Sequence, residues 1–342
     1  MRILLLSGMR NEAPYVVDWL AHHRALGATD ALIASNDCED GTDALLDALA
    51  PAGVVHLPLG AVRDAGPPTP QWRMLRAAWD HPLREACDWA LHVDVDEYVE
   101  TDGLPALIEG MPGAEAIVLP WRLFGHAGHL RAGDAPVPAR FRRAAPEAVT
   151  YPLLASFFKT LFDLSGPWEG FGVHRPRQTA APRLVDDEGA PRPDLAAAPS
   201  RIALWRGGRA PAARRVALNH YSVRSIEEFA VKRARGLPNR VGKAVDLTYW
   251  VERNFNTEEA TGMDAHLPAL EAEAARLRAL PGVAEAEARG RLWHRERAAA
   301  LLATPEGARL AGRLALARTS APPPPAQARR LIALLQAAEA GA

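Results

Sequence analysis

The chain has 342 residues, of which 48% are hydrophobic, and its 40 Lys and Arg residues balance 41 Asp and Glu residues to a formal net charge of −1. This length and composition are sufficient for one large core, or for one core with a helical appendage. The neutral balance argues against a nucleic-acid-binding protein, because such proteins normally carry a basic excess.

The expected compartment is the cytoplasm. Cys38 and Cys87 are too few for a disulfide framework in a chain of this length. The opening apolar run, residues 3–6, is shorter than the roughly 7–15 residues of a signal-peptide core and the roughly 20 of a membrane-spanning helix. No later run reaches that length. We therefore expect no transmembrane segment, and peripheral contact at the inner face of the membrane is the alternative to a freely cytoplasmic protein.

Short apolar runs alternate with helical patterns in the first 120 residues or so. Such alternation predicts a doubly wound α/β fold, with a mostly parallel sheet covered by helices on both faces. Sheets of this kind bind ligands outside the carboxyl ends of their strands. The expected strands cover residues 3–6, 32–34, 54–57, 89–93 and 116–119, and the expected helices cover 14–26, 43–50 and 71–86, the last interrupted near Pro82.

After about residue 120, the alternation of apolar runs and helical patterns becomes less regular. Residues 126–150 and 178–200 are rich in Pro, Ala, Arg and Asp and predict loops, of which the second is a candidate for a mobile segment. Ser225 and Glu228 form an S-x-x-E capping box, which predicts the start of a helix.

The chain becomes rich in Ala, Leu, Arg and Glu from about residue 264, and the segment APPPPAQ at 321–327 separates a last helix from the others. We expect an α/β domain over residues 1–260, with halves of about 1–120 and 121–260, and a helical extension over 261–342. Apolar residues recur in this extension at helical spacing, so its helices are expected to pack against the α/β domain or a second subunit. These residues are Leu270, Ala274 and Leu277.

The strongest local signal is the segment ALHVDVDEYVE at residues 90–100. A strand ends there and delivers three carboxylates. Side chains two residues apart in an extended chain point the same way, so Asp94 and Asp96 can converge on one ion at the carboxyl end of the strand. Hard oxygen ligands suit Mg²⁺ or Mn²⁺. The alternative is that these two residues and Glu97 are solvated loop carboxylates.

Five segments in this order resemble family 2-like glycosyltransferases, in the bacterial branch related to the family 92 enzymes. The segments are RNEAPYVVDWLAHHRALG at 10–27, NDCEDGT at 36–42, WALHVDVDEYVE at 89–100, WRLFGHAGH at 121–129 and NHYSVRSIEEFAVKRARG at 219–236. The resemblance covers roughly residues 1–256 and does not reach the helical tail. It implies the nucleotide-sugar fold called GT-A, with Mn²⁺ or Mg²⁺ and a nucleotide-diphosphate sugar as the donor.

The resemblance implies a metal-dependent glycosyltransferase that moves a sugar, with inversion, to a hydroxyl group of a carbohydrate or glycoconjugate acceptor. Surface or extracellular polysaccharide synthesis is the expected context, by analogy alone. A non-catalytic nucleotide-sugar or glycan-binding module of the same fold is the alternative, against which the intact D-x-D argues. A Ser-His-Asp hydrolase would require a G-x-S-x-G motif, which the sequence lacks.

Three residues are expected at the metal ion. Asp96 is the expected direct ligand, while Asp94 contacts the ion through water or binds the ribose. His220 follows an apolar run, and its imidazole can serve as a third ligand; a structural role on a strand is the alternative. The ion would neutralise the diphosphate as it leaves, which is usually worth several kcal/mol.

Two short segments near the N-terminus are expected to bind the donor. Asn11 and Glu12 precede a helix, whose free N–H groups suit an anion or a base edge, and helix capping is the alternative. Asp37 could accept a hydrogen bond from the nucleotide base, with Asn36 beside it, or form an Asx turn.

Two later helices supply further donor-binding candidates. Gln71 and Arg76 lie on a helix that packs near the donor in related proteins, and core or surface roles are equally open. Lys232 and Arg235 are three residues apart on the capped helix and could face either the diphosphate or solvent. His174, which lies outside these helices, is a further candidate for the site.

An inverting transfer needs a carboxylate that takes the proton of the acceptor hydroxyl. The expected base is Glu169, in the run SGPWEGFGVH at 165–174. Glycines on both sides let the backbone approach a substrate, and desolvation there would raise the pKa of the carboxylate. A loop-stabilising role is the alternative for Glu169, and Asp163 and Glu97 are the other candidates for the base.

Overall fold

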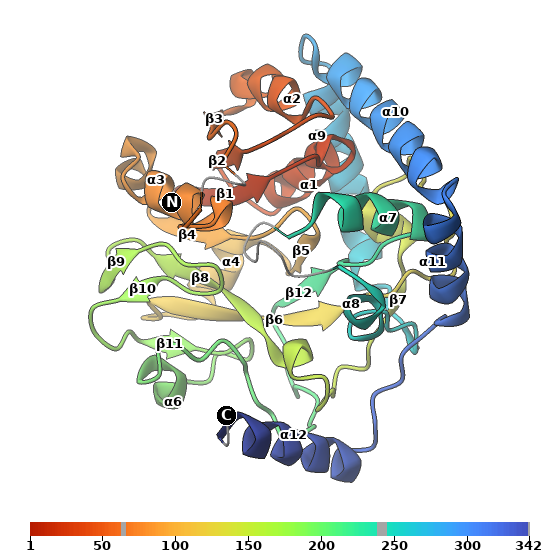
Figure 1. The fold of residues 1–342 in the computed structure, drawn as a ribbon. Coiled ribbons are helices and arrows are strands. Elements are labelled where there is room, and N and C mark those ends of the chain that lie inside the picture. The colour runs from red at the N-terminus through yellow and green to blue at the C-terminus, as the bar shows by residue number, and fades with distance from the viewer. Residues whose placement is uncertain (63–65, 238–244, 341–342) are drawn as a thin grey trace.

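One mixed sheet of nine strands organises the part of the chain that the computed structural model describes, residues 1–62, 66–237 and 245–340 (Figure 1). Its strands are β1 (Ile3–Met9), β2 (Asp30–Ser35), β3 (Val54–Pro58), β4 (Trp89–His92), β5 (Glu97–Glu100), β6 (Ala116–Leu123), β8 (Phe158–Asp163), β11 (Leu184–Val185) and β12 (Ala217–His220). The order is β3-β2-β1-β4-β8-β6-β12-β5, and β11 also pairs with β6. Two separate ribbons pair β7 (Arg143–Ala144) with β13 (Glu258–Glu259) and β9 (Trp168–Gly170) with β10 (Arg177–Gln178).

The expected parallel pairing is confirmed for the first strands, since β1 pairs in parallel with β2 and β4, and β2 with β3. The sequence did not predict β8, which runs antiparallel between β4 and β6, or β5, which is antiparallel to β12. Only the four residues 93–96 separate β4 from β5. That connection is too short for the crossover that parallel neighbours require, and β5 pairs elsewhere in the sheet.

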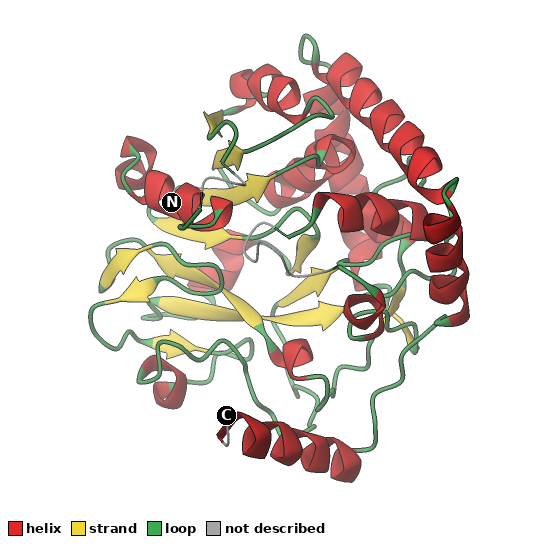
Figure 2. Cartoon of the chain, viewed as in Figure 1, coloured by secondary structure: helices red, strands yellow, loops and turns green. Residues whose placement is uncertain are grey.

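Helices cover both faces of the sheet (Figure 2). Successive side chains of a strand point to opposite faces. Ile3 and Leu5 of β1 therefore pack in the same buried cluster as α1, whereas Leu4 and Leu6 pack in the cluster that contains α3. The helices are α1 (Ala13–Ala25), α2 (Thr42–Ala48), α3 (Pro70–Trp79), α4 (Leu104–Glu109), α5 (Val137–Arg140), α6 (Pro193–Ala196), α7 (Ile226–Arg235), α8 (Leu247–Val251), α9 (Leu267–Arg278), α10 (Val283–Leu302), α11 (Pro305–Leu316) and α12 (Pro325–Ala340).

Several local expectations are confirmed. The helix expected at 71–86 is interrupted, with α3 ending at Trp79 and a 3₁₀ helix following at Pro82–Ala86. The capping box of Ser225 and Glu228 opens α7. The two segments expected to be loops contain short elements: α5 and β7 lie in 126–150, and β11 and α6 in 178–200.

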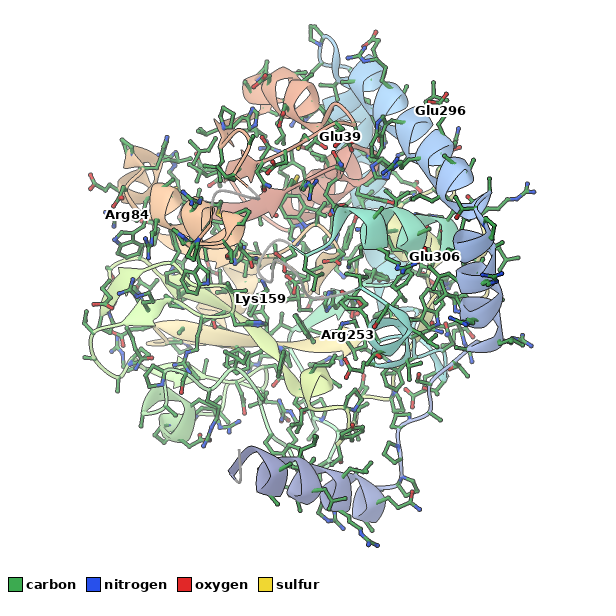
Figure 3. All side chains as sticks on the ribbon, viewed as in Figure 1. Glu39, Arg84, Lys159, Arg253, Glu296 and Glu306 are labelled. Carbon is green, nitrogen blue, oxygen red and sulfur yellow. The ribbon has the colours of Figure 1, made fainter. Side chains whose placement is uncertain are left out.

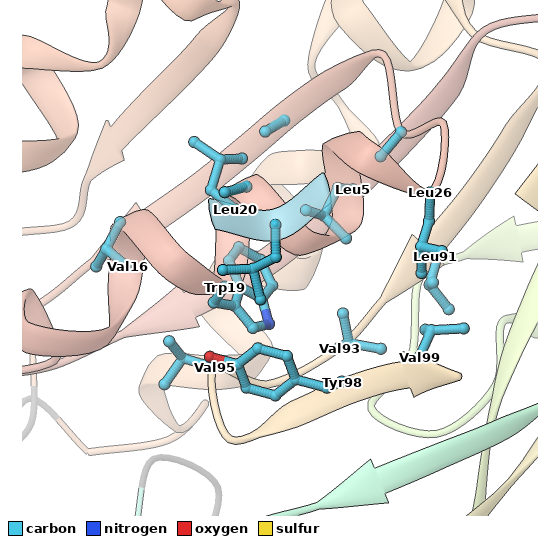
Figure 4. Packing of buried hydrophobic residues seen from close by; sticks show 14 of the residues in the cluster. Leu5, Val16, Trp19, Leu20, Leu26, Leu91, Val93, Val95, Tyr98 and Val99 are labelled. Carbon is cyan, nitrogen blue, oxygen red and sulfur yellow. The ribbon is translucent and has the colours of Figure 1, made fainter. Parts of the chain in front are cut away.

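Trp19 of α1 connects the core to the D-x-D-E turn. Its side chain is fully buried and packs near Leu5 and Tyr98 (Figure 4). Its indole N–H donates to the carbonyl oxygens of Asp94 and Glu97, each at 3.1 Å. The backbone of the acidic turn is therefore fixed from the core side.

The first tail helices pack on the α/β part of the chain, with α9 and α10 both against α1. Asp40 accepts a hydrogen bond from the backbone N–H of Ala13 at 2.9 Å and lies 3.0 Å from Nε2 of His294 on α10. The tail is thereby tied to the start of α1. The residues expected from their helical spacing to be buried, Leu270, Ala274 and Leu277, are fully buried in the main core cluster.

The last helix, α12, follows an extended linker and lies apart from the other tail helices (Figure 1). Ala328 and Ile332 are its buried side chains, whereas Leu331, Leu334 and Leu335 are exposed. Among the described residues, no helix combines the length and apolar character needed to cross a membrane.

Candidate active site

The parallel strands end at one cavity. Because β1, β2 and β4 run in the same direction, their carboxyl ends meet at one edge of the sheet, where the residues that follow them line a cavity of about 690 Å³. The helices α3, α7 and α12 and the end of α8 contribute further walls. The charged, imidazole and amide side chains of the lining are Arg10, Glu12, Asn36, Gln71, Asp94, Asp96, His174, His220, Lys232, Arg235, Glu252 and Arg253.

Asp94 is held at the end of β4 by three side chains. Lys159 of β8 donates to its Oδ2 at 3.2 Å, Gln71 of α3 donates to its Oδ1 at 3.3 Å, and Nε2 of His92 lies 3.9 Å from Oδ1. Burial alone would raise the pKa of Asp94, but the ammonium group of Lys159 and the imidazole of His92 lower it. Asp94 is therefore an ionised carboxylate facing the cavity.

Asp96 is held by residues from two other elements. Lys232 of α7 donates to its Oδ2 at 2.7 Å, and Nε2 of His220, at the end of β12, lies 3.6 Å from its Oδ1. Burial would raise the pKa of Asp96, yet Lys232 and His220 hold that pKa well below its usual range. Because the capping box starts α7 nearby, the position of Lys232 depends on a feature that is visible in the sequence.

Glu97 lies behind the cavity and does not line it. Its side chain is fully buried, and it accepts hydrogen bonds from the backbone N–H of Asp94 and from the indole of Trp121, both at 2.7 Å. Nζ of Lys159 lies 3.5 Å from the same carboxylate. Burial raises the pKa of Glu97 to about 8, and Lys159 opposes that rise. The contacts of Glu97 are those of a residue that positions Asp94 and Trp121.

Lys159 contacts the acidic turn of the site but was not among the residues expected from the sequence. Its side chain is 1% exposed and bridges Asp94 and Glu97 toward the middle of the molecule (Figure 3). A signal was present, because Lys159 interrupts the apolar run FFKTLF, and a lysine in a buried strand requires an acidic partner. The identity of that partner could not be read from the sequence.

Trp121 lies between the histidines of the cavity. Its ring is 4.3 Å from the ring of His220 and 5.4 Å from that of His174. Burial lowers the pKa of both imidazoles, that of His174 to about 4. His220 is thus a neutral imidazole, and its buried Nδ1 has no hydrogen-bond partner in the structure.

A second charged group lies beside the aspartates. Glu12 forms ion pairs with Arg235 of α7 and, at 3.7 Å, with Arg224. Arg10 and Arg235 each donate to the backbone carbonyl oxygen of the other at 2.8 Å. Burial lowers the pKa of Arg235 to about 10, which keeps it charged at neutral pH. This part of the cavity wall is therefore cationic, with Lys232 next to it on the same helix.

The remaining donor-binding candidates divide into two groups. Asn36 and Gln71 line the cavity, whereas Asn11, Asp37 and Arg76 do not. Asn11 does not cap α1, because its Oδ1 accepts from the backbone N–H of Glu39 at 2.7 Å. Asp37 accepts from Asn36 at 2.7 Å and from the backbone N–H of Val62 at 3.3 Å, and Arg76 is exposed on α3.

The structure does not bring Glu169 or Asp163 to the cavity. The expected desolvation of Glu169 is wrong, because its side chain is 50% exposed on β9 and forms a 2.7 Å ion pair with Arg177 of β10. Oδ1 of Asp163 accepts from the backbone N–H and the hydroxyl group of Ser165. The aromatic neighbours have structural contacts, since Trp168 donates to the carbonyl oxygen of Asp163 at 2.6 Å.

The donor types in the cavity fit a divalent cation. Two ionised carboxylates, Asp94 and Asp96, and the neutral imidazole of His220, whose Nε2 lies 3.6 Å from Oδ1 of Asp96, are ligand types that Mn²⁺ and Mg²⁺ accept. In the described part of the chain, however, no three His, Cys, Asp or Glu side chains are grouped closely enough to hold an ion by themselves. Phosphate oxygens of a bound ligand would have to complete the coordination, as is common for Mg²⁺.

These observations define an α/β protein with an acidic pair and a cationic wall in one cavity at the carboxyl ends of parallel strands. No family model and no curated protein matches the chain. Among solved structures, it is similar to that of the galactosyltransferase LgtC in complex with donor and acceptor sugar analogues, with 12% sequence identity and a TM-score of 0.25. The match covers 47% of this chain and 58% of that chain, so it spans little more than half of the length of the galactosyltransferase.

Proposed function

We propose that the protein is a glycosyltransferase of the GT-A type, which binds a nucleotide-diphosphate sugar in this cavity and transfers the sugar, with inversion, to a hydroxyl acceptor. The observation that carries the proposal is that the D-x-D pair, Asp94 and Asp96, lines the same cavity as Lys232 and Arg235. Carboxylates that can bind a cation, together with cations that can bind phosphate, match the chemistry of a diphosphate leaving group.

In this proposal the donor occupies the charged part of the cavity. Lys232 and Arg235 bind the diphosphate, and Asn36 contacts the nucleoside part. Asp94, Asp96 and His220 would hold Mn²⁺ or Mg²⁺, which supplies Lewis-acid neutralisation of the leaving group when bound. Lys159 and Glu97 keep Asp94 and Trp121 in place from behind the cavity.

The acceptor proton requires a carboxylate that is not already held by several cations. Among the described residues, Glu12, Asp94, Asp96 and Glu252 are the carboxylates that line the cavity. The first three have buried cationic partners from other elements. Glu252, at the end of α8, is 39% exposed and contacts its neighbour Arg253 at 3.1 Å. We therefore assign the role of base to Glu252 and not to Glu169, which does not line the cavity.

Thermal shift measurements with nucleoside diphosphates test the proposed function. We expect one nucleoside diphosphate to raise the apparent stability, by about 2.7 kcal/mol at a hundred times its Kd, because only the folded state binds it. Mn²⁺ should increase this shift in the wild type and not in Asp96→Asn. Asp163→Asn removes a carboxylate outside the cavity and should retain the full shift. If no nucleoside diphosphate stabilises the protein, with or without Mn²⁺, the proposal fails.

A non-catalytic nucleotide-sugar-binding module is the second candidate. It is favoured by one observation: Lys159 and Lys232 already pair with Asp94 and Asp96, so the charges of these two carboxylates are balanced without a metal ion. Such a module would give the same thermal shift. The release of free nucleoside diphosphate from a sugar donor, measured with acceptor mixtures, distinguishes the module from a transferase. Only an enzyme cleaves the donor and releases the nucleoside diphosphate.

A further inference from the structure

The cavity has two parts of different chemistry. The charged part contains Asp94, Asp96 and Lys232, whereas another part of the lining is apolar. Trp121 connects the two parts, since its ring lies 4.3 Å from that of His220 and 5.6 Å from that of Phe157. The apolar wall that continues from Trp121 consists of Leu153, Leu154, Phe157, Ile202 and Leu335.

The apolar wall continues to the surface of α12. Leu335 lines the cavity and is also 41% exposed, and its neighbours Leu331 and Leu334 are 38% and 60% exposed. The helix is held by Ala328 and Ile332, which are buried. A strip of exposed leucine side chains therefore leads from the mouth of the cavity along α12. Exposed apolar groups grouped in this way mark a binding surface more often than isolated ones do.

We infer that the acceptor is an amphiphile, with its hydroxyl group in the charged part of the cavity and a hydrocarbon chain along the wall from Phe157 to Leu335. The inference rests on the proposed function, because it names the class of its acceptor. A sugar without an apolar substituent would leave the leucines of α12 in water. A purely apolar ligand would make no polar contact with the charged part of the cavity, where Asp96 and Lys232 lie. A molecule with a polar head joined to a chain satisfies both parts of one continuous cavity.

Binding of n-alkyl β-glucosides of increasing chain length, below their micelle concentration, tests the inference. The affinity, measured by calorimetry in the presence of saturating nucleoside diphosphate and again without it, should rise about two- to fourfold with each added methylene and then level off. This rise is the expected effect of moving one CH₂ from water to an apolar wall. Equal affinity for methyl and octyl glucosides would overturn the inference. That result would leave nucleotide binding, and hence the proposed function, intact.

Two neighbouring residues of α12 provide a matched pair of variants. Leu335→Ser changes the wall of the cavity. It should reduce the ratio of the affinity for octyl glucoside to that for methyl glucoside by about three- to tenfold, because part of the apolar contact is lost. Leu334→Ser changes a more exposed leucine of the same strip that does not line the cavity, and it should reduce this ratio of affinities less than Leu335→Ser does. Both side chains are partly exposed, so neither change leaves a buried void. An equal loss in both variants would indicate unspecific adsorption to α12 and would contradict the inference.

Discussion

Glu252→Gln should lower kcat by about 10²–10⁴-fold while the affinity for the donor stays near that of the wild type. The amide keeps the shape of the side chain but cannot take a proton, and general-base catalysis typically contributes a factor of this size. Because proton transfer occurs only in the transition state, the loss should appear in kcat and kcat/KM together. Initial-rate kinetics with a donor identified by thermal shift measure both constants.

Glu169→Gln is the matched variant, since it makes the same chemical change on β9 outside the cavity. We expect it to retain nearly the full kcat, and its loss of the exposed ion pair with Arg177 should cost at most about 1 kcal/mol of stability. Full kcat in a stable Glu252→Gln protein would exclude Glu252 as the base. A sharp loss of kcat in Glu169→Gln alone would instead support the base expected from the sequence. Full kcat in both variants would make Asp163 and Glu97 the next candidates to test.

The contrast between these two glutamates shows why the sequence did not identify the base. The run SGPWEGFGVH has glycines and aromatics at spacings that suit a sugar-binding loop and a β-ribbon equally well. In the structure, Phe171 packs edge-on against Trp79 of α3 at 5.1 Å, so the aromatic side chains stabilise the fold. Their burial turns Glu169 outward. Glu252 follows α8 in a segment without a local motif, and its proximity to the cavity arises only from the packing of α8.

The parts that the sequence predicted depend on short-range patterns. Short runs of three to five residues located β1 to β4, and the D-x-D followed β4 at the carboxyl end of the sheet as expected. The S-x-x-E pattern at Ser225 predicted the start of α7 and thus the helix that carries Lys232. The antiparallel strand β8 was not predicted, because its burial on both faces hides the alternation that marks a strand. Because Lys159 lies on β8, its position beside Asp94 and Glu97 was not predicted either.

Lys159→Met should lower the free energy of unfolding by about 3–5 kcal/mol, the usual consequence of removing one partner of a buried ion pair. Methionine has a similar length and apolar character, so the change leaves little void. The carboxylates of Asp94 and Glu97 lose their shared ammonium group, and the side chain of Glu97 is fully buried. Urea unfolding of the wild type and the variant measures the difference.

This loss should be larger at pH 9 than at pH 5. Burial already raises the pKa of Glu97 from 4.5 to about 8 with Lys159 beside it. A group whose pKa is raised in the folded state contributes stability that is full below its unfolded pKa and is lost as the pH rises through the folded value. Without Lys159 the pKa rises further, so a protonated Glu97 is tolerated at pH 5, whereas its ionisation at pH 9 costs more. Equal losses at the two pH values would show that Glu97 does not depend on Lys159.

A second substitution separates the lost charge pair from a simple packing defect. Adding Glu97→Gln to Lys159→Met removes the unpaired carboxylate, and the amide oxygen can still accept the hydrogen bond from Trp121. The double variant should therefore be more stable than Lys159→Met at pH 9 and should lose most of the difference between pH 5 and pH 9. If the two substitutions acted independently, their changes in the free energy of unfolding would add. For residues in contact, the change in the double variant deviates from that sum by about 0.5–3 kcal/mol. A double variant less stable than Lys159→Met at pH 9 would mean that the methionine disrupts packing around β8, and that the ion pair is not what stabilises the D-x-D turn.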